Sequence, residues 1–290
     1  MNEIVAGVDG SAISLEAVDW AAAEAARRDA PLRLVHAVVP WLLRPEVDPR
    51  VVEIRDWLRN SGQEVIDDAV ARVRERAPGV RVSAELAPGG PPRALLAAAE
   101  NAAMVVVGSH GTGRLTGLLL GSVALQVASH APCPAVIIRH SDLSAGKEVV
   151  VGVDGSDSCQ AAIGFAFDAA ALRKTRLRAV LAWTHPASAV PGEMQPLVFD
   201  PELDTAEEES RILAESLAGW QEQFPDVEVV RDVVQGRPTR VLVAASSGAD
   251  LLVVGTRGRG GFAGLMLGSV SHAMLHHTRC PLAIVPPSAR

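Results

Sequence analysis

The sequence predicts an α/β protein of two tandem doubly wound domains, each a five-stranded parallel sheet with helices on both faces. The chain has 290 residues, of which 48% are hydrophobic, and this is enough for a full core in each of two domains of ordinary size. "IVAGVDGSAISLEAVDWAA", starting at residue 4, returns as "VVVGVDGSDSCQAAIGFAF", starting at residue 149. Within each half, short runs of β-branched residues alternate with segments that have a helical pattern. This alternation is typical of a parallel sheet covered by helices.

The first half contains five runs that we interpret as strands, at Ile4–Val8, Leu32–Val39, Val80–Ala87, Met104–Gly108 and Ala135–Arg139. Segments between them are predicted helices. The first of these helices carries an apolar stripe at Leu15, Val18, Ala22 and Ala25, and Ser11 or Ser14 can cap it. Residues 53–76 form a long charged helix with a solvated outer face.

The second half repeats the pattern, with predicted strands at Val149–Val153, Leu177–Trp183, Val227–Val234, Leu251–Gly255 and Leu282–Val285. Residues 205–224 are the second long charged helix. A polar stretch, "RHSDLSAGKE" at 139–148, is the natural linker. We therefore expect a first domain over 1–140, a linker over 141–148 and a second domain over 149–290.

Composition excludes several functional classes. The formal net charge is −7, from 27 basic and 34 acidic residues, which argues against a nucleic-acid or anionic-membrane partner. Residues 115–138 lack charged side chains, but glycines and prolines interrupt them, so a buried helix and strand explain them better than a membrane span. A strand-like pattern begins at Ile4, which leaves no room for a secretory signal and predicts a cytoplasmic location. Cys133, Cys159 and Cys280 show no metal or disulfide spacing and are expected to pack in the core.

Two glycine-rich loops follow the fourth predicted strand of each half. Their shared pattern is Gly-x2-Gly-x9-Gly-Ser, and it falls at 108, 111, 121 and 122 and again at 255, 258, 268 and 269. Glycine lets backbone N–H groups approach an anion, and the Gly-Ser pairs start helices whose free N–H groups favour phosphate. Asp9 and Asp154 end the first strands and can accept hydrogen bonds from ribose hydroxyls or a base if the first and fourth strands are neighbours. The sequence therefore predicts a nucleotide crevice in each half, against a simple tight turn for the loops and a helix cap or turn former for the aspartates.

Other nucleotide and hydrolase signatures are absent from the sequence. There is no GxxxxGK[ST], since the only Gly-Lys pair lies in the linker, no GxGxxG after the first strand and no GxSxG. His110 in the first loop corresponds to Arg257 in the second. Because two unlike residues fill one position, solvation or packing is favoured there, while Arg114 and Arg259 could reach phosphate or remain solvated.

The loop spacing, the strand-one Val-Asp-Gly-Ser and the closing "HAPCPAVII" and "HTRCPLAIV" closely resemble the universal stress protein family, in particular its tandem two-domain actinobacterial members. The resemblance covers nearly the whole chain and implies strand order 3-2-1-4-5, with ATP in the crevice. It implies two ATP molecules per chain, with or without Mg²⁺ held by the phosphates, and places Ala37 and Ala182 beside adenine. The implied site residues are Val8, Asp9, Gly10, Ala37, Gly108, Gly111, Gly113, Gly121, Ser122 and Val123 in the first half, and Val153, Asp154, Gly155, Ala182, Gly255, Gly258, Gly260, Gly268, Ser269 and Val270 in the second.

The expected function is ATP binding that sets conformation or the choice of a regulatory protein partner in stress, dormancy or growth control. No carboxylate, lysine or histidine common to both halves looks like a catalytic base. The rivals are an adenine-nucleotide hydrolase, faintly suggested by "VDGSDS" at 153–158, and an interaction scaffold that binds no nucleotide. The last strands, Ala135–Arg139 and Leu282–Val285, are expected sheet edges that pair in a homodimer or between the halves. Trp183, where the first half has Val38, either borders the adenine or packs in the core.

Overall fold

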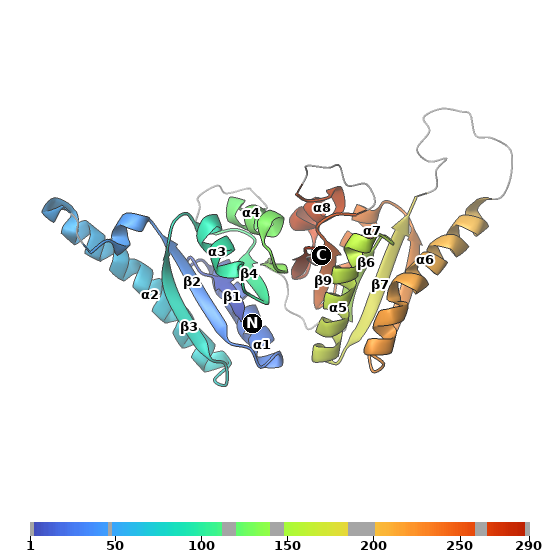
Figure 1. The fold of residues 1–290 in the computed structure, drawn as a ribbon, viewed down its shortest axis with the longest axis horizontal. Helices are drawn as coiled ribbons and strands as arrows, with labels where there is room; N and C mark the ends of the chain where they lie inside the picture. Colours follow the sequence, from blue (N-terminus) through green and yellow to red (C-terminus); the bar gives the residue numbers. More distant parts are fainter. Residues whose placement is uncertain are drawn as a thin grey trace, which may run out of the picture. The chain divides into compact units, whose positions relative to one another are not determined.

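The computed structural model describes residues 3–45, 48–111, 120–139, 148–184, 201–258 and 266–287, with the backbone alone for 201–205. The chain divides into two compact units, Met1–His140 and Ser141–Arg290 (Figure 1). In each unit, helices flank a parallel sheet of five strands. The α/β fold class predicted from the alternating runs is therefore confirmed.

The first unit has the strand order β3-β2-β1-β4-β5, and all four pairs of neighbours are parallel. Its strands are β1 (Ile4–Gly7), β2 (Leu32–Val38), β3 (Val82–Pro88), β4 (Met104–Gly108) and β5 (Ala135–Ile138). Pairing of Ile4 with Met104 makes β1 and β4 neighbours. The order of the strands reverses between them, so a ligand crevice is expected beyond their carboxyl ends.

Four helices cover the two faces of this sheet, α1 (Ala12–Arg27), α2 (Val52–Arg76), α3 (Pro91–Ala99) and α4 (Ser122–His130). Helix α1 contacts β1, β4 and α2, whereas α3 contacts β1, β2 and α4. The buried face of α1 is rich in alanine, with Ala17, Ala21 and Ala25 fully inaccessible to solvent. Small side chains let this helix approach the sheet closely, which brings its N-terminus next to the end of β4.

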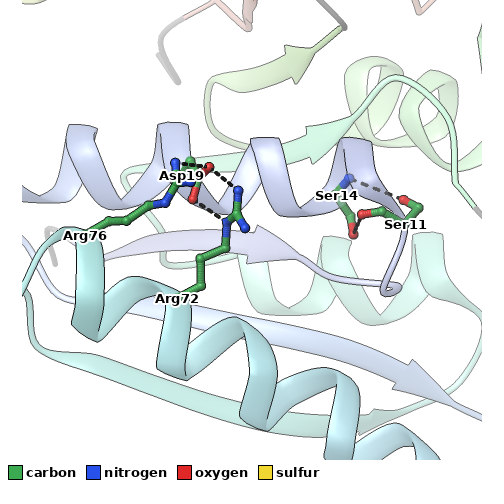
Figure 2. A network of polar contacts seen from close by, with 5 residues as sticks. All are labelled: Ser11, Ser14, Asp19, Arg72 and Arg76. Atoms are coloured by element: carbon green, nitrogen blue, oxygen red, sulfur yellow. Dashed lines mark hydrogen bonds and ion pairs between the residues drawn. The ribbon is translucent and has the colours of Figure 1, made fainter.

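An ion-pair cluster joins α1 to α2 (Figure 2). Arg72 donates from Nε and Nη2 to the two carboxylate oxygens of Asp19, at 2.6 and 2.7 Å, and Arg76 adds a third bond at 2.7 Å. The hydrogen bond with Asp19 raises the pKa of Arg72 above its usual value. A bidentate arginine pair that is only partly exposed is stronger than an ordinary surface ion pair.

Replacing this carboxylate should weaken the first unit. We expect Asp19→Asn to lower the free energy of unfolding by about 1 kcal/mol, because an amide keeps the shape but loses the charge that both arginines share. Urea unfolding followed by circular dichroism measures the change. The control is Asp67→Asn, on an exposed residue of α2 that accepts one bond from Gln63. Equal effects of the two variants would mean that the cluster adds nothing to the packing of α1 on α2.

The second unit repeats the topology in the order β8-β7-β6-β9-β10, again with parallel neighbours. Its strands are β6 (Glu148–Val153), β7 (Arg176–Trp183), β8 (Val229–Gln235), β9 (Leu251–Gly255) and β10 (Leu282–Val285). Its helices are α5 (Gln160–Arg173), α6 (Pro201–Gln223), α7 (Pro238–Ala245) and α8 (Ser269–His277). Short 3₁₀ turns occur in the first unit at Pro40–Leu43 and Pro49–Val51, and in the second at Asp157–Cys159.

The strand boundaries differ from the sequence predictions by at most two residues, whereas α6 begins at Pro201, four residues before its predicted start. Glu148, expected in the linker, begins β6 and pairs with Arg176 of β7 at 2.8 Å. The rest of the predicted linker lies outside the described residues. Strand β3 begins at Val82 rather than Val80, because the Val80 N–H closes a turn to the Ala77 carbonyl. None of the described helices is long and apolar enough to cross a membrane.

An aromatic cluster distinguishes the core of the second unit. Phe167 of α5 stacks on Trp220 of α6 and on Phe224 just beyond that helix, with ring centroids 6.5 and 5.7 Å apart. Phe167 is fully buried, and the Trp220 indole donates to the Gln160 side chain at 2.9 Å. Gly164 leaves room for the indole, since a Cβ there would lie 2.3 Å from Trp220 Cη2. Stacked aromatic rings therefore hold α5 against α6, whereas ion pairs join α1 to α2.

Candidate functional site

Each unit has a pocket at the carboxyl ends of its strands. The first has a volume of about 590 Å³ and the second about 550 Å³, both in the size range of small-molecule sites. The first pocket is lined by the predicted residues Val8, Asp9, Ala37, Gly108, Gly111, Gly121, Ser122 and Val123. The second is lined by Val153, Asp154, Ala182, Gly255, Gly258, Gly268, Ser269 and Val270. The fold thus brings together residues that are more than 100 positions apart in sequence.

Four predicted residues are not in those linings. Gly113 and Gly260 lie outside the described residues, as do Arg114 and Arg259. Gly10 and Gly155 are described but do not line the pockets. Their φ angles are +81° and +73°, a conformation that other residues adopt only at a cost. These two glycines shape the turn after the aspartates rather than a pocket wall.

The aspartates are held in a fixed orientation by the turn that follows them. Asp9 Oδ1 accepts hydrogen bonds from the backbone N–H of Ser11 at 3.0 Å and from its hydroxyl at 2.6 Å. Asp154 makes the same two bonds with Ser156, at 3.0 and 2.6 Å. Ser11 also caps α1 by accepting from the Ser14 N–H at 3.2 Å (Figure 2). The aspartates are therefore turn formers as well as pocket residues, and one of the two roles does not exclude the other.

The second glycine of each loop is required by the aspartate opposite. A Cβ on Gly111 would lie 2.1 Å from Asp9 Oδ2, and one on Gly258 would lie 2.3 Å from Asp154 Oδ2. Both distances are far below van der Waals contact, so any side chain must displace the carboxylate. The loop backbone and the aspartate thus form one rigid corner in each pocket.

Helix α4 forms a wall of the first pocket and α8 a wall of the second, and each wall offers backbone donors. Gly121 and Gly268 stand at the N-cap positions of these helices and have no side chain to cap them. The first helical bonds run from Leu125 to Gly121 and from His272 to Gly268. The N–H groups of the three residues between each such pair have no acceptor within the helix. These residues, Ser122, Val123 and Ala124 in the first unit and Ser269, Val270 and Ser271 in the second, line the pockets.

The structure adds lining residues that the sequence reasoning missed. Pro91 and Leu95 of α3 line the first pocket, and Pro238 and Leu242 of α7 line the second. A Cβ on Gly7 would lie 3.0 Å from Leu95, so the strand glycine makes room for this leucine. Both helices start with a proline three residues after a strand, so the two halves can be aligned there, but only the structure shows that these residues line the pockets.

Glu209 is the most consequential addition, because it places a second carboxylate at the second pocket. Counting back from the ends of α2 and α6, its position corresponds to Gly62 in the first unit. A Cβ on Gly62 would lie 3.3 Å from both His36 of β2 and Leu86 of β3. His36 donates from Nδ1 to the Val8 carbonyl, 2.7 Å away, and the second unit has Leu181 there. The pockets therefore differ on the β2 and β7 side, which loop motifs alone cannot reveal.

Two further residues of the second unit, Trp183 and Cys159, are structural rather than reactive. Trp183 is buried and is not among the described residues that line the pocket, so core packing is the better of its two predicted interpretations. Cys159 does line it, where the first pocket has Ser14, but burial raises the pKa of its thiol. Cys133 and Cys280 are also buried, and burial raises the pKa of each to about 11. These thiols are protonated at neutral pH and are not activated nucleophiles.

Comparisons with known proteins agree with this architecture. The model of the universal stress protein family matches residues 1–139 and 146–286. Universal stress protein Rv2623 of Mycobacterium tuberculosis (strain ATCC 25618 / H37Rv) is 39% identical, over 98% of this chain and 96% of its own length. A universal stress protein of Mycolicibacterium smegmatis (strain ATCC 700084 / mc(2)155) is 36% identical, over 98% and 97%.

Among solved structures, the crystal structure of a universal stress protein from Archaeoglobus fulgidus DSM 4304 has a TM-score of 0.69 at 17% identity, covering 99% of this chain and 96% of that one. This likeness concerns the fold alone. The family match over both halves and the two relatives over almost the full length place the chain more specifically. The protein belongs to the universal stress protein family.

Proposed function

We propose that each pocket binds one ATP molecule and that nucleotide occupancy regulates the conformation of the protein or its binding to a partner in stress response, dormancy or growth control. One observation carries this proposal. In each unit, an aspartate held by hydrogen bonds and an uncapped helix N-terminus both face the pocket of that unit. The volume of each pocket suits a nucleotide.

The wall that α4 forms in the first pocket, and the wall that α8 forms in the second, suit the phosphates of a nucleotide. Three backbone N–H groups at each helix start, together with the positive end of the helix dipole, favour an anion without a lysine. Gly108 and Gly255 end the preceding strands, and a Cβ on Gly108 would lie 3.2 Å from the backbone of Ile13. The glycine thus lets the end of β4 pack closely against the start of α1, and both border the pocket.

The opposite walls suit the nucleoside. Ala37 and Ala182 lie at the ends of β2 and β7, where a small side chain leaves space for a flat ring. Asp9 and Asp154 are acceptors for ribose hydroxyls, in the role that acidic residues play in other dinucleotide folds.

Magnesium would be held mainly by the phosphates. Among the described residues there is no cluster of three or more His, Cys, Asp or Glu side chains suited to a metal ion. Mg²⁺ commonly binds through substrate phosphates with only one or two carboxylates, and Asp9 is the one acidic residue among the described lining of the first pocket. The donor set is compatible with this arrangement and does not require it.

Equilibrium binding of ATP tests the proposal against its two rivals. We expect saturable binding to the purified chain, with adenine nucleotide among the small molecules that mass spectrometry detects in freshly prepared protein. Failure to bind ATP at millimolar concentration would favour the scaffold without nucleotide. Release of ADP or AMP over several turnovers per site would instead establish the hydrolase.

Regulation requires a second state of the protein. A nucleotide shifts a population only through its differential affinity for two conformations, so ATP must change a measurable property such as amide-exchange protection outside the pockets. The cytoplasmic location, the regulatory protein partner and the homodimer through the last strands also stay predictions.

A further inference from the structure

The two pockets differ in the side chain that stands beside the uncapped helix. His110 lies two residues after Gly108, where β4 ends, and Arg257 lies two residues after Gly255, where β9 ends. Both side chains line their own pocket. The same place in the fold thus carries an imidazole in one unit and a guanidinium in the other.

The backbone around this position is alike in both units. Gly121 N–H donates to the Ser109 carbonyl and Gly268 N–H to the Thr256 carbonyl, each at 2.7 Å. A Cβ on Gly121 would lie 3.2 Å from His110 Cα, and one on Gly268 would lie 3.5 Å from Arg257 Cα. Each side chain therefore starts directly beside the residue that precedes the free N–H groups. Only the chemistry of the side chain distinguishes the two phosphate walls at this point.

Arginine and histidine differ in how strongly they respond to phosphate charge. A guanidinium is always charged and binds phosphate oxygens with two parallel hydrogen bonds. An imidazole cannot form two parallel N–H bonds to one phosphate, and His110 Nδ1 already lies 3.0 Å from the Ser109 hydroxyl. We propose that Arg257 makes the second pocket selective for nucleotides with more phosphate charge, whereas the first pocket discriminates less between nucleoside triphosphates and monophosphates. This inference rests on the proposed nucleotide function of the same pockets.

Glu209 adds a negative charge to the second pocket, but on the other side of it. The equivalent Gly62 faces β2 and β3, so Glu209 belongs to the side of β7 and β8. Arg257 follows β9, and β6 lies between β7 and β9 in the sheet. The carboxylate therefore reaches the pocket from the side of β7 and β8, and it opposes ATP more than AMP because ATP carries more negative charge. The effect of Arg257 on the ratio of the two affinities must therefore outweigh that of Glu209.

Reciprocal exchange of the two residues tests the proposal. ATP and AMP are titrated calorimetrically at pH 8 without magnesium, so that the phosphates keep their full charge. In the unmutated chain we expect two classes of site whose ratios of ATP to AMP affinity differ by about tenfold. His110→Arg should raise the ratio at the first site, and Arg257→His should lower the ratio at the second.

Two more variants keep the result interpretable. Arg257→Gln removes the charge with a side chain that cannot titrate, so it should reproduce the lower ratio even if Arg257→His folds poorly. Glu209→Gly should widen the difference between the ratios, because it removes a negative charge that opposes ATP more than AMP at the second site. Equal ratios at both sites of the unmutated chain, or ratios that do not follow the exchange, would overturn this inference while leaving nucleotide binding in place. Absence of any nucleotide binding would overturn the proposed function and this inference together.

Discussion

Gly111→Val should abolish nucleotide binding at the first pocket, and Gly258→Val should abolish it at the second. We expect each variant to weaken its own site by about 100-fold or more, because the new side chain meets an aspartate oxygen at 2.1 or 2.3 Å. Neither aspartate can yield easily, since its other oxygen is held by two hydrogen bonds to Ser11 or Ser156. The corner that shapes the pocket must therefore open. Calorimetry with ATP measures the loss.

Gly79→Val provides the matched control for these variants. Gly79 lies between α2 and β3, and a Cβ there would meet nothing within 4 Å. This change should leave both sites intact and the circular dichroism spectrum unaltered. If Gly111→Val and Gly258→Val bound ATP as well as Gly79→Val does, the glycine corners could not be part of the binding sites.

Phe167→Ala should destabilise the second unit by about 3–5 kcal/mol, the largest effect on stability that we expect from one core residue. Phe167 is fully buried and stacks on Trp220 and Phe224, so truncation removes buried area and two ring contacts. Urea unfolding followed by tryptophan fluorescence measures the change, since Trp220 lies in the cluster.

The less severe Phe167→Leu separates ring stacking from the cavity. It keeps an apolar side chain in the space and should retain the larger part of the stability. A loss below 1 kcal/mol for Phe167→Ala would contradict the view that the aromatic cluster holds α5 and α6 together.

The fold could be predicted almost entirely from the sequence because its signals are local or repeated. Parallel strands buried on both faces appear as β-branched runs such as Met104–Gly108, whose predicted and observed bounds agree. The duplication also fixed the number of units, since every signal in the first half recurred in the second. Strand ends were less predictable, as at Val80, because a turn hydrogen bond rather than residue type decides where pairing begins.

The described residues of the loop motifs line the pockets, whereas the sequence reasoning missed residues that reach the pocket from another element. Gly111 and Gly258 were singled out for phosphate, yet their immediate neighbour is the aspartate carboxylate, which only three-dimensional packing reveals. Glu209 escaped notice because it lies on a charged helix whose acidic residues read as a solvated face. The sequence left two roles for Trp183, because side chains alternate between the two faces of a strand and a shift of one residue moves the ring to the other face.

The number of ATP molecules bound per chain tests the central claim most directly. Calorimetric titration of the unmutated protein should saturate at two ATP molecules per chain, because each unit has its own aspartate, glycine loop and uncapped helix. Each single glycine variant should reduce this number to one, and the double variant Gly111→Val with Gly258→Val should reduce it to zero. Saturation of the unmutated chain at one ATP, or undiminished binding by the double variant, would contradict the claim of one nucleotide site in each unit.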